Sequence, residues 1–165
     1  MKKLLAALAA CVLLAGCALP RAAFSPLRYF TGAFTLAHGD YAVEGNITCN
    51  SYEDIRLAFT HPQALTFFTV TLTSGAVLTD TAGKADEIAL PELPPAAPLR
   101  LLGEALRMSV YGPADFTPRG EDYIAALSLD GTAAECVFAP DGEIKEIRCP
   151  AADVSVTFYE IQSKG

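Results

Sequence analysis

The sequence predicts an α+β domain that is mostly β, with an antiparallel sheet curled around one or two helices. Most of the chain after residue 29 alternates apolar and polar side chains, the period typical of strands with one buried face. One amphipathic segment at residues 98–111 interrupts this alternation and has helical spacing. Asp130-Gly131 and Asp141-Gly142 stand between alternating runs, where such pairs favour hairpin turns. A lone amphipathic helix among strands must bury its apolar stripe against the sheet.

The N-terminal segment has the pattern of a secretion signal that ends at a cysteine. Lys2 and Lys3 precede an apolar run over residues 4–14, which is too short to span a bilayer as a mature helix. The run ends in Leu-Ala-Gly-Cys17, which resembles the bacterial lipobox, a motif whose cysteine is diacylated and becomes the new N-terminus. We therefore expect a lipoprotein signal peptide at residues 1–16, palmitate-type chains on Cys17 and a lipidated tether at residues 17–28. A plain secretory signal with an incidental cysteine is the alternative.

The expected location and partners follow from this signal and from the charge. Residues 29–165 should form a single domain outside the cytoplasm, lipid-anchored to a bacterial membrane, which is the outer membrane if the cell has two. Without the signal, the chain keeps 10 basic side chains against 19 acidic ones. No cluster of Lys and Arg interrupts this acidity, and nucleic acids are bound through such clusters. The expected partners therefore include the membrane and no nucleic acid, while a protein partner stays open.

Alternation places six strands before the helix and four after it. They are expected at residues 30–36, 41–49, 55–60, 68–73, 77–81 and 87–90, and then at residues 123–129, 133–138, 144–149 and 154–158. Pro62 ends the third strand because proline offers no N–H to a neighbouring strand. Residues 27–30 either begin a short second helix or run straight into the first strand.

The helix lies between proline-rich and glycine-containing breaks. Pro98 opens it after a proline-rich connector, and Gly112-Pro113 ends it after about Tyr111. Its apolar stripe consists of residues spaced by three and four, widened by flanking apolar residues: Leu99, Leu102, Leu106 and Val110, with Leu101, Ala105 and Met108. The side chains expected to face away from the sheet are Arg100, Glu104 and Arg107.

The mature chain has three cysteines besides the lipid site. Cys136 and Cys149 flank the Asp141-Gly142 turn and form a disulfide candidate in a compartment that permits such bonds. A two-residue loop sets Cys136 opposite Ile147 with Cys149 one diagonal away, whereas a bulged loop sends the two cysteines to opposite faces. Free buried thiols are the alternative. A metal site is not expected, since there is no Cys-x-x-Cys pair and neither histidine is near a cysteine in sequence.

Three stretches carry a resemblance to a known family. Residues 41–48, 55–65 and 90–106 are similar to small bacterial lipoproteins of the lipoprotein-localisation superfamily, which includes the carrier LolA and the receptor LolB. The resemblance implies a LolA/LolB-like half-barrel of about eleven strands, covered by helices, whose apolar interior binds acyl chains.

The function expected from these observations is binding without catalysis. There is no Gly-x-Ser-x-Gly, His-Glu-x-x-His or phosphate-loop motif, so we expect no enzyme, no catalytic residue and no cofactor. The resemblance implies a lipid or other apolar ligand in the half-barrel, with lipid or lipoprotein handling as the role. The expected ligand-binding residues lie on the apolar faces of their elements: Phe34, Ile47, Leu57, Phe59, Val70, Leu72, Leu102 and Leu106. The alternative is a filled barrel that serves as a structural or protein-interaction module at the membrane surface.

Overall fold

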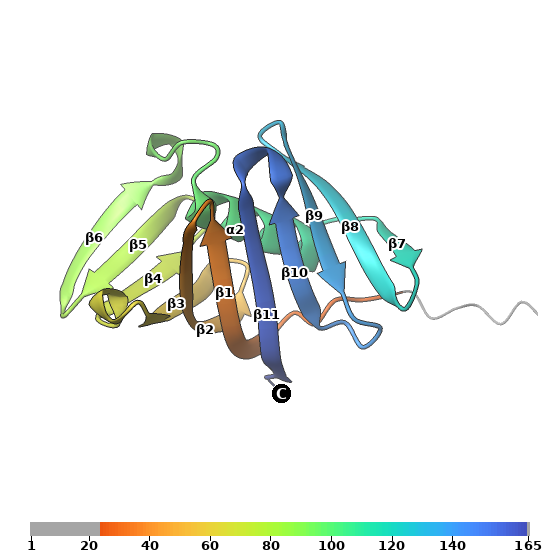
Figure 1. The fold of residues 1–165 in the computed structure, drawn as a ribbon, viewed down its shortest axis with the longest axis horizontal. Helices are drawn as coiled ribbons and strands as arrows, with labels where there is room; N and C mark the ends of the chain where they lie inside the picture. Colours follow the sequence, from red (N-terminus) through yellow and green to blue (C-terminus); the bar gives the residue numbers. More distant parts are fainter. Residues whose placement is uncertain (1–23, 165) are drawn as a thin grey trace, which may run out of the picture.

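A single antiparallel sheet makes up most of the computed structural model, which describes residues 24–164. Its eleven strands are β1 (Phe30–His38), β2 (Tyr41–Ser51), β3 (Asp54–His61), β4 (Phe68–Leu72), β5 (Ala76–Thr81), β6 (Lys84–Ala89), β7 (Phe116–Arg119), β8 (Asp122–Leu129), β9 (Thr132–Phe138), β10 (Ile144–Cys149) and β11 (Val154–Ser163) (Figure 1). The signal peptide, Cys17 and residues 17–23 of the tether lie outside the described residues.

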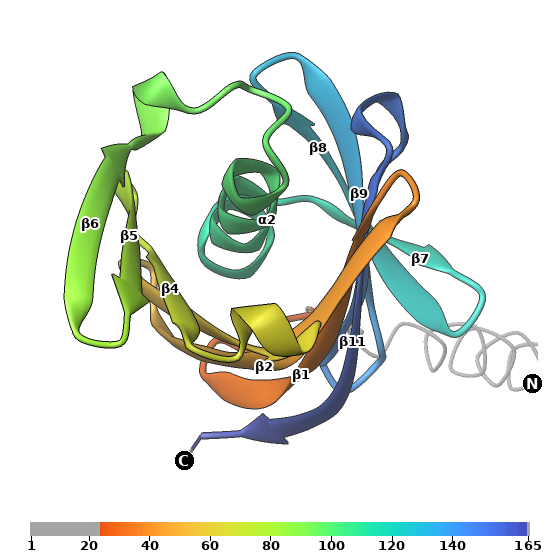
Figure 2. The same ribbon diagram turned by 60° about the vertical axis from the view of Figure 1, so that its left-hand side comes forward.

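The sheet has two arms that meet at β1. β1 pairs with β2 on one side and with β11 on the other, from Phe30 opposite Ser163 to His38 opposite Val154. We call β2–β6 the first arm and β7–β11 the second arm. β6 and β7 end the strand order and do not pair with each other, so the sheet stays open. Figure 2 shows it curled around the helix, which confirms the expected half-barrel.

The helix occupies the expected residues but changes geometry within them. α2 (Pro98–Leu106) begins with Pro98, whose missing N–H is tolerated in a first turn. It continues into the π-helical turn η3 (Arg107–Tyr111), which closes with the N–H of Gly112 donating to the carbonyl of Arg107 at 2.9 Å. Short 3₁₀ turns lie at η1 (Gln63–Leu65), η2 (Leu90–Glu92) and η4 (Pro150–Ala152). Within residues 24–164, no helix has the length and hydropathy of a membrane span.

The core lies between the concave face of the sheet and the helix. Side chains from both arms and from α2 form one continuous apolar cluster. Gly45 allows the closest approach in this layer, since a Cβ there would lie 2.4 Å from the carbonyl oxygen of Ala58 and 2.9 Å from the ring of Phe34. The buried faces of β1 and β3 are those expected from alternation, whereas Tyr41 is 81% exposed at the start of β2, beside the turn to β1.

Two further differences from the expected elements have local causes. β7 was not expected because Pro118 and charged neighbours interrupt its apolar pattern. As an edge strand paired only with β8, it tolerates a residue that lacks an N–H. Residues 27–29 form no helix and run straight into β1, with the N–H of Leu27 donating to the carbonyl of Gly142 at 2.8 Å.

Candidate functional site

The eight expected ligand-binding residues lie together in the apolar cluster under the helix. Seven of them are at most 3% exposed, and Phe59 packs against the cluster from a partly buried position. The rings of Phe34 and Phe59 meet edge to face with centroids 6.0 Å apart. In this structure the concave face is packed against the leucines of α2. Ligand binding by these residues remains a prediction.

The polar face of the helix corrects the sequence analysis at two positions. Arg107 was expected to face away from the sheet, yet it is only 4% exposed. Met108 was expected to widen the buried stripe, yet it is 41% exposed. Turns of the sheet, which a helical-wheel pattern cannot take into account, cover the side of the helix that carries Arg107.

Arg100 is fully engaged at the start of the helix. Its Nε donates to Glu104 at 2.9 Å, and its Nη1 donates to the carbonyls of Leu90 and Leu93 at 3.2 and 2.9 Å. Its Nη2 pairs with the carboxylate of Asp130 in the β8–β9 turn. One guanidinium therefore ties α2 both to the connector that follows the first arm and to a turn of the second arm.

Arg107 has a different environment two turns later. Among the described residues it forms no ion pair, and its Nη1 is buried without a hydrogen-bond partner. Its guanidinium carbon lies 5.9 Å from the ring centroid of Tyr52, a cation–π contact. Burial lowers the pKa of this guanidinium, and Tyr52, Glu104 and Glu53 act in the opposite direction through their charges. Both carboxylates are engaged elsewhere, Glu104 by Arg100 and Glu53 by the N–H of Ser74 at 2.7 Å.

A pocket of about 270 Å³ lies where the helix meets turns of both arms. We call it the seam pocket. It is lined by Tyr52 and Ser74 from turns of the first arm, Leu90 from η2, Glu104, Arg107 and Met108 from the helix, and Ser128, Leu129 and Asp130 from the β8–β9 hairpin. The pocket combines apolar walls with the unpartnered guanidinium, the arrangement typical of small-molecule sites.

Sequence analysis missed the seam pocket because its lining comes from five separated segments. One local signal was available. Gly103 lies inside an otherwise good helix, where glycine is unfavourable by about 1 kcal/mol relative to alanine. A Cβ at Gly103 would lie 3.0 Å from Nη2 of Arg107. The absent side chain leaves the space that the guanidinium occupies.

The three cysteines of the described residues are free and buried. Cys136 pairs with Ile147, so Cys136 and Cys149 share a face in the diagonal arrangement expected for a short loop. Their disulfide remains a prediction. Burial raises the pKa of Cys136 to about 12 and that of Cys49 to about 11. Sγ of Cys49 lies 3.3 Å from the hydroxyl of Tyr111, which donates to the carbonyl of Arg28 at 2.6 Å.

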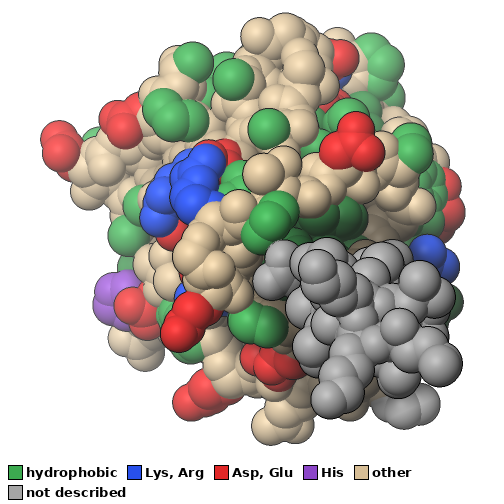
Figure 3. Space-filling view, turned by 90° about the vertical axis from the view of Figure 1, so that its right-hand side faces the viewer, with side chains coloured by type: hydrophobic (Ala, Val, Ile, Leu, Met, Phe, Trp, Pro, Cys, Tyr) green, Lys and Arg blue, Asp and Glu red, His purple; other side chains and the backbone are tan. Residues whose placement is uncertain are grey.

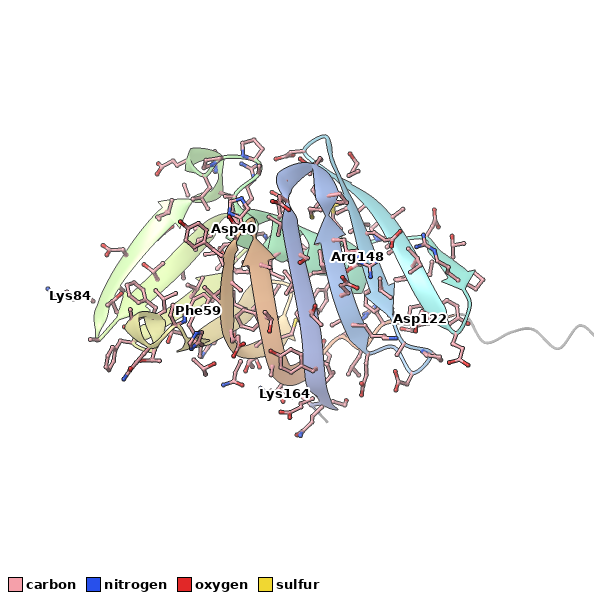
Figure 4. The ribbon with its side chains drawn as sticks, viewed as in Figure 1. Asp40, Phe59, Lys84, Asp122, Arg148 and Lys164 are labelled. Carbon is pink, nitrogen blue, oxygen red and sulfur yellow. The ribbon has the colours of Figure 1, made fainter. Side chains whose placement is uncertain are left out.

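Basic side chains are dispersed over the outer surface. Figure 4 places Lys84, Arg148 and Lys164 on separate parts of the molecule. On the face shown in Figure 3, acidic side chains are scattered among hydrophobic ones. Within residues 24–164, no group of three His, Cys, Asp or Glu side chains is placed to hold a metal ion.

The described chain begins with an aromatic contact to the second arm. The ring of Phe24 stacks on Tyr123 with centroids 4.1 Å apart and also meets Phe116 and Phe138 at 4.7 and 5.9 Å. Together with the hydrogen bond from Leu27 to Gly142, this contact fixes the point at which the tether leaves the domain.

Comparison with known proteins gives similarity at the level of structure. No protein-family model and no curated protein sequence matches the chain significantly. An uncharacterized conserved protein from Thermus thermophilus is similar over 84% of this chain and 80% of its own, with 9% identity and a TM-score of 0.51. A LolA superfamily protein from Nitrosomonas europaea is similar over 85% of this chain and 88% of its own, with 8% identity and a TM-score of 0.49. A chain of the Pseudomonas aeruginosa MucA/MucB complex is similar over 83% of this chain and 53% of its own, with 15% identity and a TM-score of 0.44.

These identities make the likeness one of fold alone. The open antiparallel sheet curled around a helix is the fold that the sequence analysis expected.

Proposed function

We propose that the protein is a cell-envelope lipoprotein that binds an acyl chain or another apolar ligand on the concave face of its half-barrel. The observation that carries this proposal is an open apolar sheet face covered, among the described residues, by one short helical segment. The proposal assigns no reaction to the protein. Lipid or lipoprotein handling is the role that the sequence resemblance favours.

Ligand entry requires a change in the contacts that the helix makes. Leu102 and Leu106 now cover the concave face, so an acyl chain there would replace part of their packing. Each buried methylene contributes about 0.8 kcal/mol, which makes chain length the main determinant of affinity. The proline-rich connector before α2 and Gly112-Pro113 after η3 are where the backbone would adjust.

A binding assay on delipidated protein tests the ligand class. We expect a fluorescent fatty-acid probe to bind, with affinity that rises with acyl length until the site is full and that depends weakly on salt. Hydrogen exchange of residues 98–111 should change when the probe binds, while exchange in β10 should stay constant. A well-folded sample that binds no probe would contradict the proposal.

Anchoring would hold the domain close to the membrane. Cys17 is seven residues before Phe24, so even a fully extended tether spans at most about 25 Å. Acyl chains on Cys17 would give stable attachment where a single chain is marginal. Because Phe24 packs on the second arm, that arm would be the one nearer the bilayer.

Replacing the lipobox cysteine tests the anchor. Cys17→Ser should abolish partitioning into the detergent phase because no thiol remains to acylate, whereas Cys11→Ser within the signal should leave it unchanged. Unchanged partitioning of Cys17→Ser would contradict the lipoprotein assignment.

A second candidate is a filled-barrel interaction module. It is favoured by the burial of seven of the eight expected ligand residues beneath the helix. It predicts no probe binding and no change in hydrogen exchange of α2 with lipid, so the same assay separates the two functions.

A further inference from the structure

We propose that the seam pocket binds the carbonyl group of an ester- or amide-linked acyl chain, with the Arg107 guanidinium as the hydrogen-bond donor. This inference rests on the proposed binding of an acyl ligand and names the group by which the ligand is recognised. It gives a reason for the burial of Arg107, which forms no ion pair within the described residues.

The first step is that the buried guanidinium of Arg107 lacks a hydrogen-bond acceptor for Nη1. A buried guanidinium without an acceptor is strongly unfavourable, and proteins normally pair such a group or leave it in water. Arg107 is 4% exposed, and its Nη1 is the one buried side-chain nitrogen or oxygen of the described residues that has no partner. An acceptor oxygen supplied by a ligand would satisfy it.

The second step is that the local structure holds the guanidinium in place. Gly103 leaves space on the helix one turn before Arg107, and the Tyr52 ring lies on the guanidinium at 5.9 Å. The helix contributes a glycine at an unfavourable position, and the first arm contributes an aromatic ring. Both features position a planar donor group beside the seam pocket, which it lines.

The third step is the chemistry of the pocket walls. Leu90, Met108 and Leu129 contribute apolar side chains to the pocket lining, so the pocket suits a group attached to a hydrocarbon chain. Met108 is partly exposed there, and its flexible thioether adapts to ligands of varied shape.

The fourth step decides between a neutral carbonyl and an anion. Glu104 and Asp130 also line the pocket, and Glu53 acts on Arg107 through its charge. These three carboxylates face two guanidiniums, those of Arg100 and Arg107, so the surroundings carry an excess of negative charge. A phosphate or carboxylate would add a further negative charge and should bind less tightly, whereas a neutral carbonyl oxygen accepts a hydrogen bond without adding charge. A neutral acceptor is also consistent with binding that depends weakly on salt.

Displacement of the fluorescent fatty-acid probe by ligands of matched chain length tests the proposal. We would compare decane, methyl decanoate, N-methyldecanamide and decanoate on the folded, delipidated domain. The ester or the amide should displace the probe at a concentration at least about tenfold lower than decane, since a hydrogen bond to a charged donor contributes on that scale. Preference for the ester indicates a glycerolipid-type ligand, and preference for the amide indicates an N-acylated one.

Variants then assign the preference to Arg107. Arg107→Met should bind decane as before and lose the tenfold preference, without a lower melting temperature. Gly103→Ala should weaken the preference because its Cβ crowds the guanidinium. Arg119→Met, on the exposed edge strand β7, is the matched control and should keep it.

Four results would overturn the inference, and they are distinguishable. Equal displacement by decane and the ester, with the probe still bound, overturns the carbonyl site and leaves the proposed function intact. A preference retained in Arg107→Met, or tighter binding of decanoate than of the ester, overturns the assignment of the donor or of the neutral acceptor. Absence of probe binding to the wild-type protein overturns the proposed function together with this inference.

Discussion

The two ends of the helical segment at residues 98–111 differ in how they accommodate an arginine. Arg100 and Arg107 are two turns apart and lie on the same face of the helix. Arg100 meets two carboxylates and two carbonyls, whereas Arg107 is more deeply buried and has an unpartnered nitrogen. The same residue type on the same face therefore acts as a structural tie at one end and has an unpaired donor nitrogen at the other.

The difference arises from what surrounds each end. The start of α2 lies beside the connector that follows β6 and the turn before β9, which present carbonyl and carboxylate oxygens. Arg107 lies beside Tyr52 and Ser74, and the nearby carboxylates of Glu104 and Glu53 are bonded to Arg100 and to the N–H of Ser74.

Removing leucines from the buried stripe should give the largest effect. Leu102→Ala and Leu106→Ala should each lower the free energy of unfolding by about 2–5 kcal/mol, since both side chains are nearly fully buried. Met108→Ala is the partly exposed control and should change it by less than about 1 kcal/mol. Denaturant unfolding measures all three, and a loss confined to one leucine would show that the two ends pack unequally.

Replacing the arginines tests the comparison directly. Arg100→Met should lower the free energy of unfolding by about 1–3 kcal/mol because the part-buried carbonyl of Leu93 loses its side-chain donor, while that of Leu90 keeps only the N–H of Leu93. Arg107→Met should leave stability unchanged or raise it, because it removes a buried charge that lacks a partner. Equal losses in the two variants would mean that Arg107 is structural and would remove the contrast.

Alkaline pH should destabilise the fold, in part through the thiol that contacts the last turn of the helix. Burial raises the pKa of Cys49, which contacts Tyr111, from 9.0 to about 11. Below pH 9 this thiol is protonated in both states. Above pH 9 the Cys49 thiol ionises in the unfolded chain before it does so in the folded one. The free energy of unfolding therefore falls as pH rises towards 11, by at most about 1.4 kcal/mol per pH unit.

Chemical unfolding between pH 7 and 11 measures this dependence. Cys49→Ala should reduce the slope above pH 9, and its stability at pH 7 separates the effect of the missing side chain from that of ionisation. A variant with the wild-type slope would show that other groups cause the alkaline loss.

The smallest effect should come from the outer partner of Arg100. The Asp130 side chain is half exposed, so Asp130→Asn should change the free energy of unfolding by about 1 kcal/mol or less. The difference should shrink at high salt, which screens exposed charges. A larger, salt-independent loss would mean that the tie between α2 and the second arm depends on this carboxylate more than on the carbonyls of Leu90 and Leu93.

Local sequence patterns determined most of the elements. Alternation located ten of the eleven strands, and the Asp-Gly pairs located two hairpins between them. The spacing of apolar residues located the helix and its buried leucines. Each of these features depends on side chains a few residues apart, so its cause is present in a short stretch of chain. The eight residues assigned to the concave face are together because each lies on the apolar face of its own element.

Tertiary structure decided the strand order, the edge strand β7 and the burial of Arg107, because each depends on residues distant in the sequence. The pairing of β1 with β11 joins segments more than 100 residues apart and creates the two arms, and no local pattern specifies it. β7 exists because β8 offers it an edge, which outweighs the proline within it. Arg107 has the same helical position as Arg100, but its burial and its unpartnered nitrogen are set by Tyr52 and other residues of the sheet turns. Periodicity determines which face of a helix a side chain occupies, and only the folded chain determines what covers that face.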